Sequence, residues 1–258
     1  MTGTGSAVEL RGLSKSFGQL RAVERIDLDA APGELVALIG PSGCGKSTLF
    51  DIVAGLEQPD GGEVRIDGTV VADRLGASAY MPQRDALLPW RRVEDNVGLP
   101  LELRGRRRAD ARRVARPLLD RFGLGDFAGA WPWQLSGGMR HRVAFLRTVV
   151  ARPTLVLLDE PFGDLDGLTR RDLQEWLGTL LTDLGPTVLL VTHDIAEAVF
   201  LADRVIVLTP RPARVAAELT VTLARPRRTD DRESPAAVCA ERDLREALQS
   251  ASWTVPRR

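Results

Sequence analysis

The sequence predicts an α/β fold with a mostly parallel sheet, and three features carry that prediction. Residues 35–39 form a continuously apolar run, as expected of a parallel strand covered on both faces. A glycine-rich loop follows, and residues 49–53 then carry apolar side chains at helical spacing. A second apolar run, residues 155–158, ends in two carboxylates and a proline. In an open parallel sheet, ligands bind beyond the carboxyl ends of such strands.

The length and composition fit one large α/β domain, with or without a subdomain, in 258 residues. Formal net charge is zero, so no global field recruits nucleic acid or an anionic membrane. Cys44 and Cys239 are the only two cysteines, which excludes a disulfide framework and fits a reducing compartment. We identify no signal peptide and no apolar run near the roughly 18 residues that a membrane span needs. Any membrane role is therefore expected to depend on a partner.

The glycine-rich loop is flanked by short predicted strands. These lie in residues 7–10, 26–28, 63–66 and 76–81. Residues 14–18 are typical of a turn between the first two strands, which places the aromatic Phe17 on a turn. On the residues alone, burial in the core is the simpler interpretation of Phe17. Gln83 directly follows the end of the last of these strands.

The loop itself fits the complete pattern of a phosphate-binding loop. Its residues are Gly40, Pro41, Ser42, Gly43, Cys44, Gly45, Lys46, Ser47 and Thr48. Glycines let backbone N–H groups turn inward around a polyphosphate, and the helix that begins near Lys46 adds the positive end of its dipole. The Lys46 ammonium then reaches the β- and γ-phosphates, and the Ser47 hydroxyl is placed to ligate Mg²⁺.

A helical pattern over residues 93–152 predicts an inserted helical segment. Within it, residues 104–116 are rich in arginine and poor in apolar residues. These arginines could form a nucleic-acid patch, but a solvated helix face beside Asp110 and Asp120 is the simpler interpretation.

Near the end of the insert, Ser136 is placed to cap a helix, and Gly137 and Gly138 behind it expose backbone N–H groups. This resembles a second anion site. Taken alone it is a weak indication, because many helix starts have this sequence.

Asp159 and Glu160 are the two carboxylates that close the second apolar strand. With a phosphate-binding loop upstream, Asp159 is placed to hold Mg²⁺ through water, and Glu160 to orient and polarise an attacking water. The next strand leads to His193. A lone histidine is usually structural, but in a parallel sheet its strand end converges with those at Gly40 and Gln83. We therefore expect His193 to contact a γ-phosphate.

The remaining elements complete the sheet and form a tail. We expect strands in residues 188–191, 205–208 and 215–219, a helix in 195–201, a polar linker in 226–235 and a short helix in 241–249.

Together these motifs resemble the nucleotide-binding subunit of an ABC transporter over about residues 7–225. The resemblance implies a P-loop NTPase core with a mostly parallel sheet, an N-terminal antiparallel β subdomain and an inserted α-helical subdomain. It implies an ABC ATPase domain in residues 1–225, with the insert at about 93–152, and a linker and short helix in 226–258. ATP and Mg²⁺ are the implied cofactors.

By this resemblance, Phe17 would stack on adenine, and residues 40–48 are the Walker A motif. Gln83 is the Q-loop residue, which would share Mg²⁺ with Ser47 and Asp159. Gln83 is also implied in catalysis, beside Glu160 as general base and His193 as the switch histidine.

The signature residues Ser136, Gly137 and Gly138 would contact the γ-phosphate of ATP held by a second ATP-binding subunit. The working unit would then be a head-to-tail pair, most simply of two copies of this chain, with two shared sites.

Within the family, residues 88–90, 135–140, 161–163 and 168–170 are most similar to subunits of nitrate, sulfonate, taurine and pyrimidine-precursor importers. Such systems imply transmembrane permease subunits and, indirectly, a periplasmic or lipid-anchored solute-binding protein. They place the chain on the cytoplasmic face of the membrane, with no nucleic-acid partner. Three residues depart from the family pattern: Asp164, His141 and Met139. They bear on rate and pH dependence more than on function.

Two leucines and Trp90 lie among loop-forming residues after Gln83. We expect them to form a solvent-facing apolar cluster, which the resemblance places beside the groove for a permease helix. Burial of Trp90 under the helical insert is the alternative.

Other classes of protein fit less well. A chromosome-maintenance or DNA-repair ATPase needs a long coiled coil before the signature, and no sustained heptads occur there. A translation factor of this family would carry two cassettes, and a non-enzymatic scaffold would not need both Glu160 and His193. An exporter cassette remains open, because only local similarities favour import.

Overall fold

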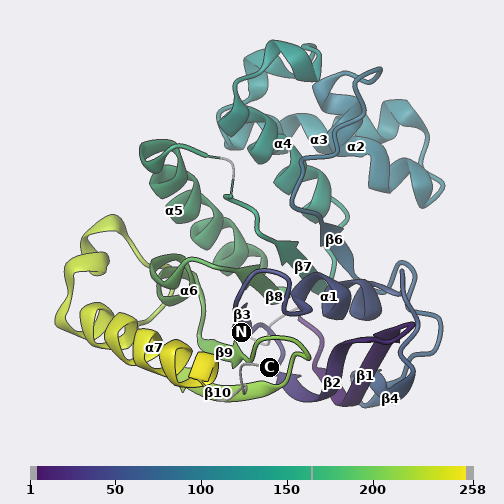
Figure 1. Ribbon diagram of the computed structural model, residues 1–258. Helices are drawn as coiled ribbons and strands as arrows, with labels where there is room; N and C mark the ends of the chain where they lie inside the picture. Colours follow the sequence, from purple (N-terminus) through teal and green to yellow (C-terminus); the bar gives the residue numbers. More distant parts are fainter. Residues whose placement is uncertain (1–4, 164, 254–258) are drawn as a thin grey trace.

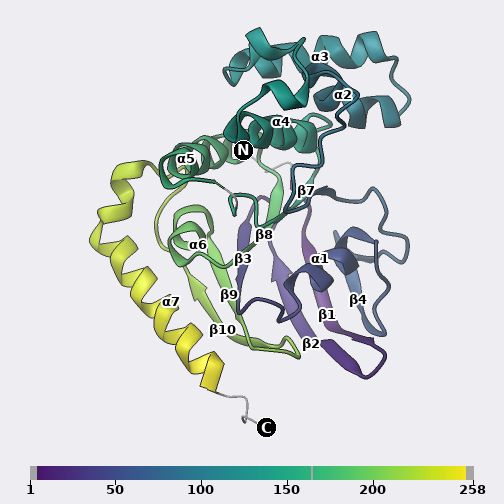
Figure 2. The ribbon, with the colours of Figure 1, turned by 45° about the horizontal axis from the view of Figure 1, so that its top comes forward.

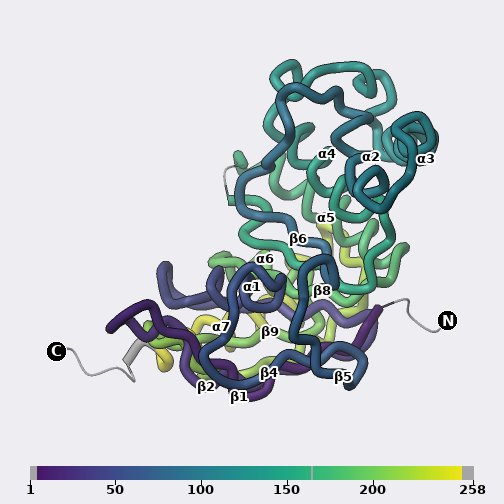
Figure 3. Tube along the Cα trace, turned by 90° about the vertical axis from the view of Figure 1, so that its right-hand side faces the viewer, coloured from purple at the N-terminus to yellow at the C-terminus, as the bar shows by residue number. Residues whose placement is uncertain are grey.

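The structure is a computed structural model that describes residues 5–163 and 165–253. It holds two sheets, with a group of helices at the end of the molecule away from the smaller sheet (Figures 1 and 3). The smaller sheet is antiparallel and has the order β2-β1-β4-β5. Its strands are β1 (Val8–Phe17), β2 (Leu20–Ala30), β4 (Gly61–Ile66) and β5 (Thr69–Val70).

The larger sheet has the order β10-β9-β3-β8-β7-β6. Its strands are β3 (Leu35–Ile39), β6 (Ala79–Met81), β7 (Leu155–Asp159), β8 (Thr187–Thr192), β9 (Arg204–Leu208) and β10 (Val215–Thr220). All pairs are parallel except β9 with β10, so the expected mostly parallel sheet and antiparallel N-terminal sheet are both confirmed.

Seven α-helices occur in the described ranges. They are α1 (Lys46–Ala54), α2 (Val93–Leu103), α3 (Arg108–Arg121), α4 (Gly137–Val149), α5 (Gly167–Leu184), α6 (Ile195–Leu201) and α7 (Pro235–Trp253). Three short 3₁₀ turns, η1 (Gly125–Phe127), η2 (Pro132–Gln134) and η3 (Thr229–Glu233), connect them. The helices α2 to α4 fall within the predicted insert.

The larger sheet separates two hydrophobic cores. Successive side chains of a strand point to opposite faces, and in β3 Leu35, Ala37 and Ile39 join one core while Val36 and Leu38 join the other. The first core contains helices α2 to α7, and the second contains α1 together with β1, β2 and β4. The phosphate-loop helix α1 and the insert therefore lie on opposite faces of the sheet.

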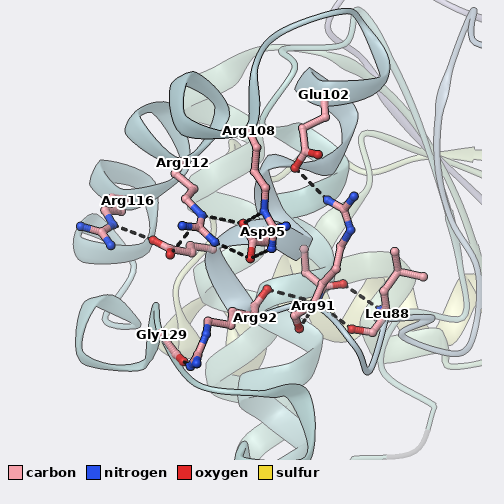
Figure 4. Close-up of polar contacts among 11 residues, drawn as sticks. Leu88, Arg91, Arg92, Asp95, Glu102, Arg108, Arg112, Arg116 and Gly129 are labelled. Carbon is pink, nitrogen blue, oxygen red and sulfur yellow. Dashed lines mark hydrogen bonds and ion pairs between the residues drawn. The ribbon is translucent and has the colours of Figure 1, made fainter.

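The arginine-rich helix α3 is held against α2 by buried acids. Asp95 is fully buried and accepts hydrogen bonds from Arg108 and Arg112, and Arg116 donates to Glu94 (Figure 4). The guanidinium groups of Arg108 and Arg112 hold the pKa of Asp95 well below its usual range, against the effect of burial. The side chains of Arg108 and Arg116 are 51% and 62% exposed, as expected of a solvated face, but the acids that they pair with belong to α2. Arg107 and Arg113 pair with Asp110.

The predicted turn over residues 14–18 is wrong, because β1 continues through it to Phe17. Register shifts interrupt the β1–β2 pairing on both sides of Leu13 and after Lys15, so small and polar residues occur inside a bulged strand. Phe17 pairs with Leu20, and the true turn is Gly18 and Gln19.

The C-terminal part also differs from expectation. Helix α7 begins at Pro235 and ends at Trp253, longer than the predicted 241–249, and packs against α6, β9 and β10 (Figure 2). The preceding segment contains η3 and a buried arginine, Arg227. Helix α5 was not among the predicted elements.

Candidate nucleotide-binding site

The phosphate-binding loop joins β3 to α1 as predicted. Lys46 is only 5% exposed, and its ammonium donates to the carbonyls of Gly40 at 2.8 Å and Pro41 at 3.0 Å. The ammonium thus binds the carbonyls at the beginning of its own loop. Gly45 has φ of 126°, and a Cβ there would lie 2.6 Å from the carbonyl oxygen of Ala22. Only glycine fits this position.

A residue that the sequence analysis missed holds the loop from outside. Arg211, in the turn between β9 and β10, donates through Nε to the carbonyl of Gly43 at 2.9 Å, and its Nη2 contacts the same oxygen. Gly43 and Arg211 are 168 positions apart, and no pattern in the sequence joins them.

Asp159 ends β7 beside the start of α1. It is 6% exposed, and the Tyr80 hydroxyl lies 3.4 Å from its Oδ2. Burial raises the pKa of Asp159, and the Ser47 hydroxyl opposes that rise. A cation is the natural partner for such a buried carboxylate, and the Ser47 hydroxyl and Asp159 are the hard oxygen donors that Mg²⁺ prefers. Within the described residues no group of three or more His, Cys, Asp or Glu is placed to hold a metal ion.

Glu160 brings two of the predicted catalytic residues together. Its Oε2 lies 3.4 Å from Nε2 of Gln83 and 3.2 Å from Nδ1 of His193. Its backbone has φ of 44°, in the left-handed region, and its N–H donates to the carbonyl of Val191 in β8. The Glu160 side chain remains 21% exposed, and that of His193 57% exposed, so the carboxylate is accessible from solvent.

Phe17 is 46% exposed at the end of β1, with the Lys15 ammonium 5.3 Å from the centre of its ring. The interpretation of Phe17 as a core residue is therefore wrong. An exposed aromatic ring at a hairpin tip is available to stack on a planar ligand.

Ser136, Gly137 and Gly138 form the first turn of α4. The Ser136 hydroxyl accepts from the Met139 N–H at 3.3 Å, which confirms the predicted N-cap. A Cβ on Gly138 would lie 2.8 Å from Cγ2 of Thr169, at the start of α5. Helix α4 contributes to the core on the face of the sheet opposite α1, so this turn and the phosphate-binding loop belong to different faces.

Comparison with known proteins decides the family. Residues 23–163 match the family described as "ABC transporter". The chain belongs to this family. It is 46% identical over 223 residues to the aliphatic sulfonates import ATP-binding protein SsuB of Ralstonia nicotianae, covering 86% of this chain and 76% of that protein. It is 42% identical over 214 residues to the taurine import ATP-binding protein TauB of Yersinia pestis, covering 83% and 84%.

Solved structures agree. The ATP-binding cassette MJ0796, in a dimeric post-hydrolysis state bound to ADP and Pi, is 31% identical with a TM-score of 0.72, covering 84% of this chain and all of that one. The expected ABC ATPase fold is confirmed, and the chain is an ATP-binding, ATP-hydrolysing subunit of the ABC transporter family.

Two of the three departures from the family pattern lie in α4. His141 is buried in α4 at 7% exposure, and Met139 packs against the first core. Asp164 lies outside the described residues.

The loop after the Q-loop glutamine is braced by one buried side chain. Asn96, fully buried in α2, accepts from the Leu88 N–H and donates to the carbonyls of Leu88, Arg91 and Arg92, at 2.8 to 3.2 Å (Figure 4). Trp90, held in this loop, is 70% exposed, so the alternative that it packs under the insert is wrong. The expected cluster of two leucines and a tryptophan is also wrong in part, because Leu87 is buried.

Proposed function

We propose that this subunit powers an importer of small organic sulfonates, a class that includes taurine. The observation that carries the site assignment is the contact of both Gln83 and His193 with one carboxylate oxygen of Glu160. The relatives named as sulfonate and taurine import proteins support the direction of transport and the class of solute.

In the proposed reaction, Glu160 accepts the proton of an attacking water, and Gln83 and His193 fix the direction in which its carboxylate points. Lys46 exchanges the carbonyls of Gly40 and Pro41 for the β- and γ-phosphates. Ser47 and Asp159, with Gln83, would hold Mg²⁺, which would neutralise charge on the phosphates. Phe17 stacks on the adenine, and the backbone N–H groups of residues 40–48 bind the phosphates.

The proposed working unit is a head-to-tail pair of this chain. The first turn of α4 belongs to the other face of the sheet from its own phosphate-binding loop, which favours action on a second subunit's ATP. The dimeric state of MJ0796 supports a pair. Ser136, Gly137 and Gly138 of one copy then complete the site around Lys46 and Glu160 of the other.

The proposed membrane attachment is peripheral. Between residues 5 and 253, with residue 164 left aside, no helix is both long and apolar enough to span a bilayer. We propose that the braced loop docks on transmembrane permease subunits through Trp90, at the cytoplasmic face of the membrane. The solute-binding protein would act on this subunit only through the permease.

Growth tests the proposal. A strain that lacks this gene, supplied with the wild-type gene or with Lys46→Ala, is grown with taurine, ethanesulfonate or sulfate as the sole sulfur source. We expect the Lys46→Ala strain to grow on sulfate and to fail on at least one sulfonate. Equal growth of both strains on every sulfonate would contradict the solute class.

A further inference from the structure

The segment before α7 is anchored to α6 by a buried arginine. Arg227 is 2% exposed and donates through Nη1 to the carbonyls of Val199 at 2.7 Å and Ala202 at 2.8 Å. These carbonyls end α6, where the helix leaves acceptors unpaired and its dipole is negative. The C-terminal segment therefore caps the helix that follows His193.

A second arginine of this segment contacts both α5 and α6. The Arg232 guanidinium lies over the Phe200 ring, 3.7 Å from its centre, and its Nη2 donates to Oε1 of Gln174 at 2.7 Å. Phe200 belongs to α6 and Gln174 to α5. One side chain thus fixes the distance between the two helices by a cation–π contact and a charged hydrogen bond.

The Gln174 amide connects Arg232 to the buried Glu197 of α6. Its oxygen accepts from Arg232, and its Nε2 donates to Oε2 of Glu197, 3.4 Å away. Gln174 is 2% exposed and Glu197 4% exposed. Asp194 and Arg170 are the charged groups that act on Glu197.

Helix α6 begins two residues after His193, and α5 contacts that start through Arg170. The Asp194 carboxylate caps α6 by accepting from the N–H groups of Ala196 and Glu197. Arg170 of α5 lies 3.6 Å from Asp194 and donates to the carbonyl of Leu165 at 2.9 Å. A series of contacts therefore links Arg232 through Gln174 and Glu197 to Asp194, the residue that adjoins His193.

We propose that Arg232 is a positioning residue for ATP hydrolysis, which holds α5 and α6 in one arrangement and thereby keeps His193 against Glu160. The proposal rests on the role given to His193 above. It predicts an effect on turnover and none on ATP binding, because the phosphate-binding loop and α1 lie on the other face of the sheet.

The test compares Arg232→Ala with Arg228→Ala in the full chain. Arg228 is in the same segment, but its side chain is 80% exposed and its ion pair with Glu175 is long, with Nη1 and Oε1 3.8 Å apart. We expect Arg232→Ala to lower kcat for ATP by roughly three- to tenfold with an unchanged Kd for ATP, because a displaced catalytic group slows chemistry without weakening binding. We expect Arg228→Ala to match the wild type. An unchanged kcat in Arg232→Ala, or a loss confined to ATP binding, would overturn the proposal.

A double variant separates positioning from general destabilisation. In a His193→Ala background, Arg232→Ala should lower kcat no further, since both changes act through one group. Full additivity of the two losses would overturn the proposal. Normal turnover in His193→Ala alone would instead show that the role of His193 is wrong.

Arg232→Met covers the case in which Arg232→Ala folds poorly. It keeps an unbranched apolar stem over Phe200 but offers no donor to Gln174, so the same loss of kcat is expected. Wild-type kcat in Arg232→Met would contradict the role proposed for the hydrogen bond to Gln174.

Discussion

Nδ1 of His193 lies 3.2 Å from Oε2 of Glu160, and the two residues directly follow the neighbouring strands β8 and β7. Parallel pairing aligns the carboxyl ends of these strands, so the contact is a product of the sheet register, in which Asp159 pairs with Val191. The first prediction concerns this carboxylate.

Glu160→Gln should abolish steady-state hydrolysis and keep ATP binding and ATP-dependent pairing. The amide has nearly the same shape but accepts no proton at neutral pH. Phosphate release measures turnover, and gel filtration with ATP measures pairing. Glu175→Gln, a change on α5 away from the site, is the control. Near-normal turnover in Glu160→Gln would show that another group is the base.

Two variants that are each inactive should restore activity when they are mixed. Lys46→Ala blocks a chain's own phosphate-binding loop, and Ser136→Arg blocks its signature turn. In a mixed pair one shared site carries both lesions and the other carries neither, so part of the turnover should return. Each variant alone is the control. Turnover that stays absent in the mixture, while wild-type turnover per chain is insensitive to dilution, would contradict shared sites.

Trp90→Ala should leave the isolated subunit as stable as the wild type and weaken its assembly with the permease. The ring is 70% exposed, so little core packing is lost. Aromatic anchors at interfaces commonly contribute about 2 kcal/mol or more, which corresponds to more than about a tenfold loss of affinity.

Thermal unfolding and co-purification with the permease measure the two effects of Trp90→Ala. Leu103→Ala is the matched control, because Leu103 is an apolar residue of the insert that is 80% exposed. A lower melting temperature with normal assembly would show that Trp90 has a structural role instead.

Glu197→Gln should remove a pH dependence of stability. Burial raises the pKa of Glu197 from its ordinary 4.5 to about 8, and Asp194 adds to the rise while Arg170 opposes it. The folded chain then keeps a proton that the unfolded chain has already lost, so this group lowers the free energy of unfolding as pH rises from 4.5 to about 8. Below the unfolded pKa it has no such effect.

The difference between wild type and Glu197→Gln isolates this effect. We expect the stability of the wild type relative to the variant to fall by on the order of 5 kcal/mol across that window. Urea unfolding at several pH values measures it. Parallel pH profiles for the two proteins would contradict a neutral, buried Glu197.

Much of the candidate site could be predicted because its signals are local. The phosphate-binding loop and the residues after β6, β7 and β8 each stand at a strand end, and a parallel sheet necessarily gathers such ends. The contacts of Glu160 with Gln83 and His193 follow from that rule, although the residues lie 77 and 33 positions away.

What could not be predicted depends on contacts between distant segments. Nothing local shows that Arg108 and Arg112 meet Asp95 of another helix, or that Arg211 binds the Gly43 carbonyl. The burial of Leu87, which the sequence analysis expected to face solvent, depends on how its loop folds. The bulges in β1 produced the wrong turn, because polar residues inside a strand have the composition of a turn.

The backbone of Glu160 adopts a conformation that favours glycine. An L-residue at φ of 44° is less stable there than glycine by about 1 kcal/mol, since its Cβ crowds the backbone. A fold optimised for robustness alone would place glycine here. The strained backbone at Glu160 marks a position where the chain carries a carboxylate needed for ATP hydrolysis at the expense of free energy of unfolding.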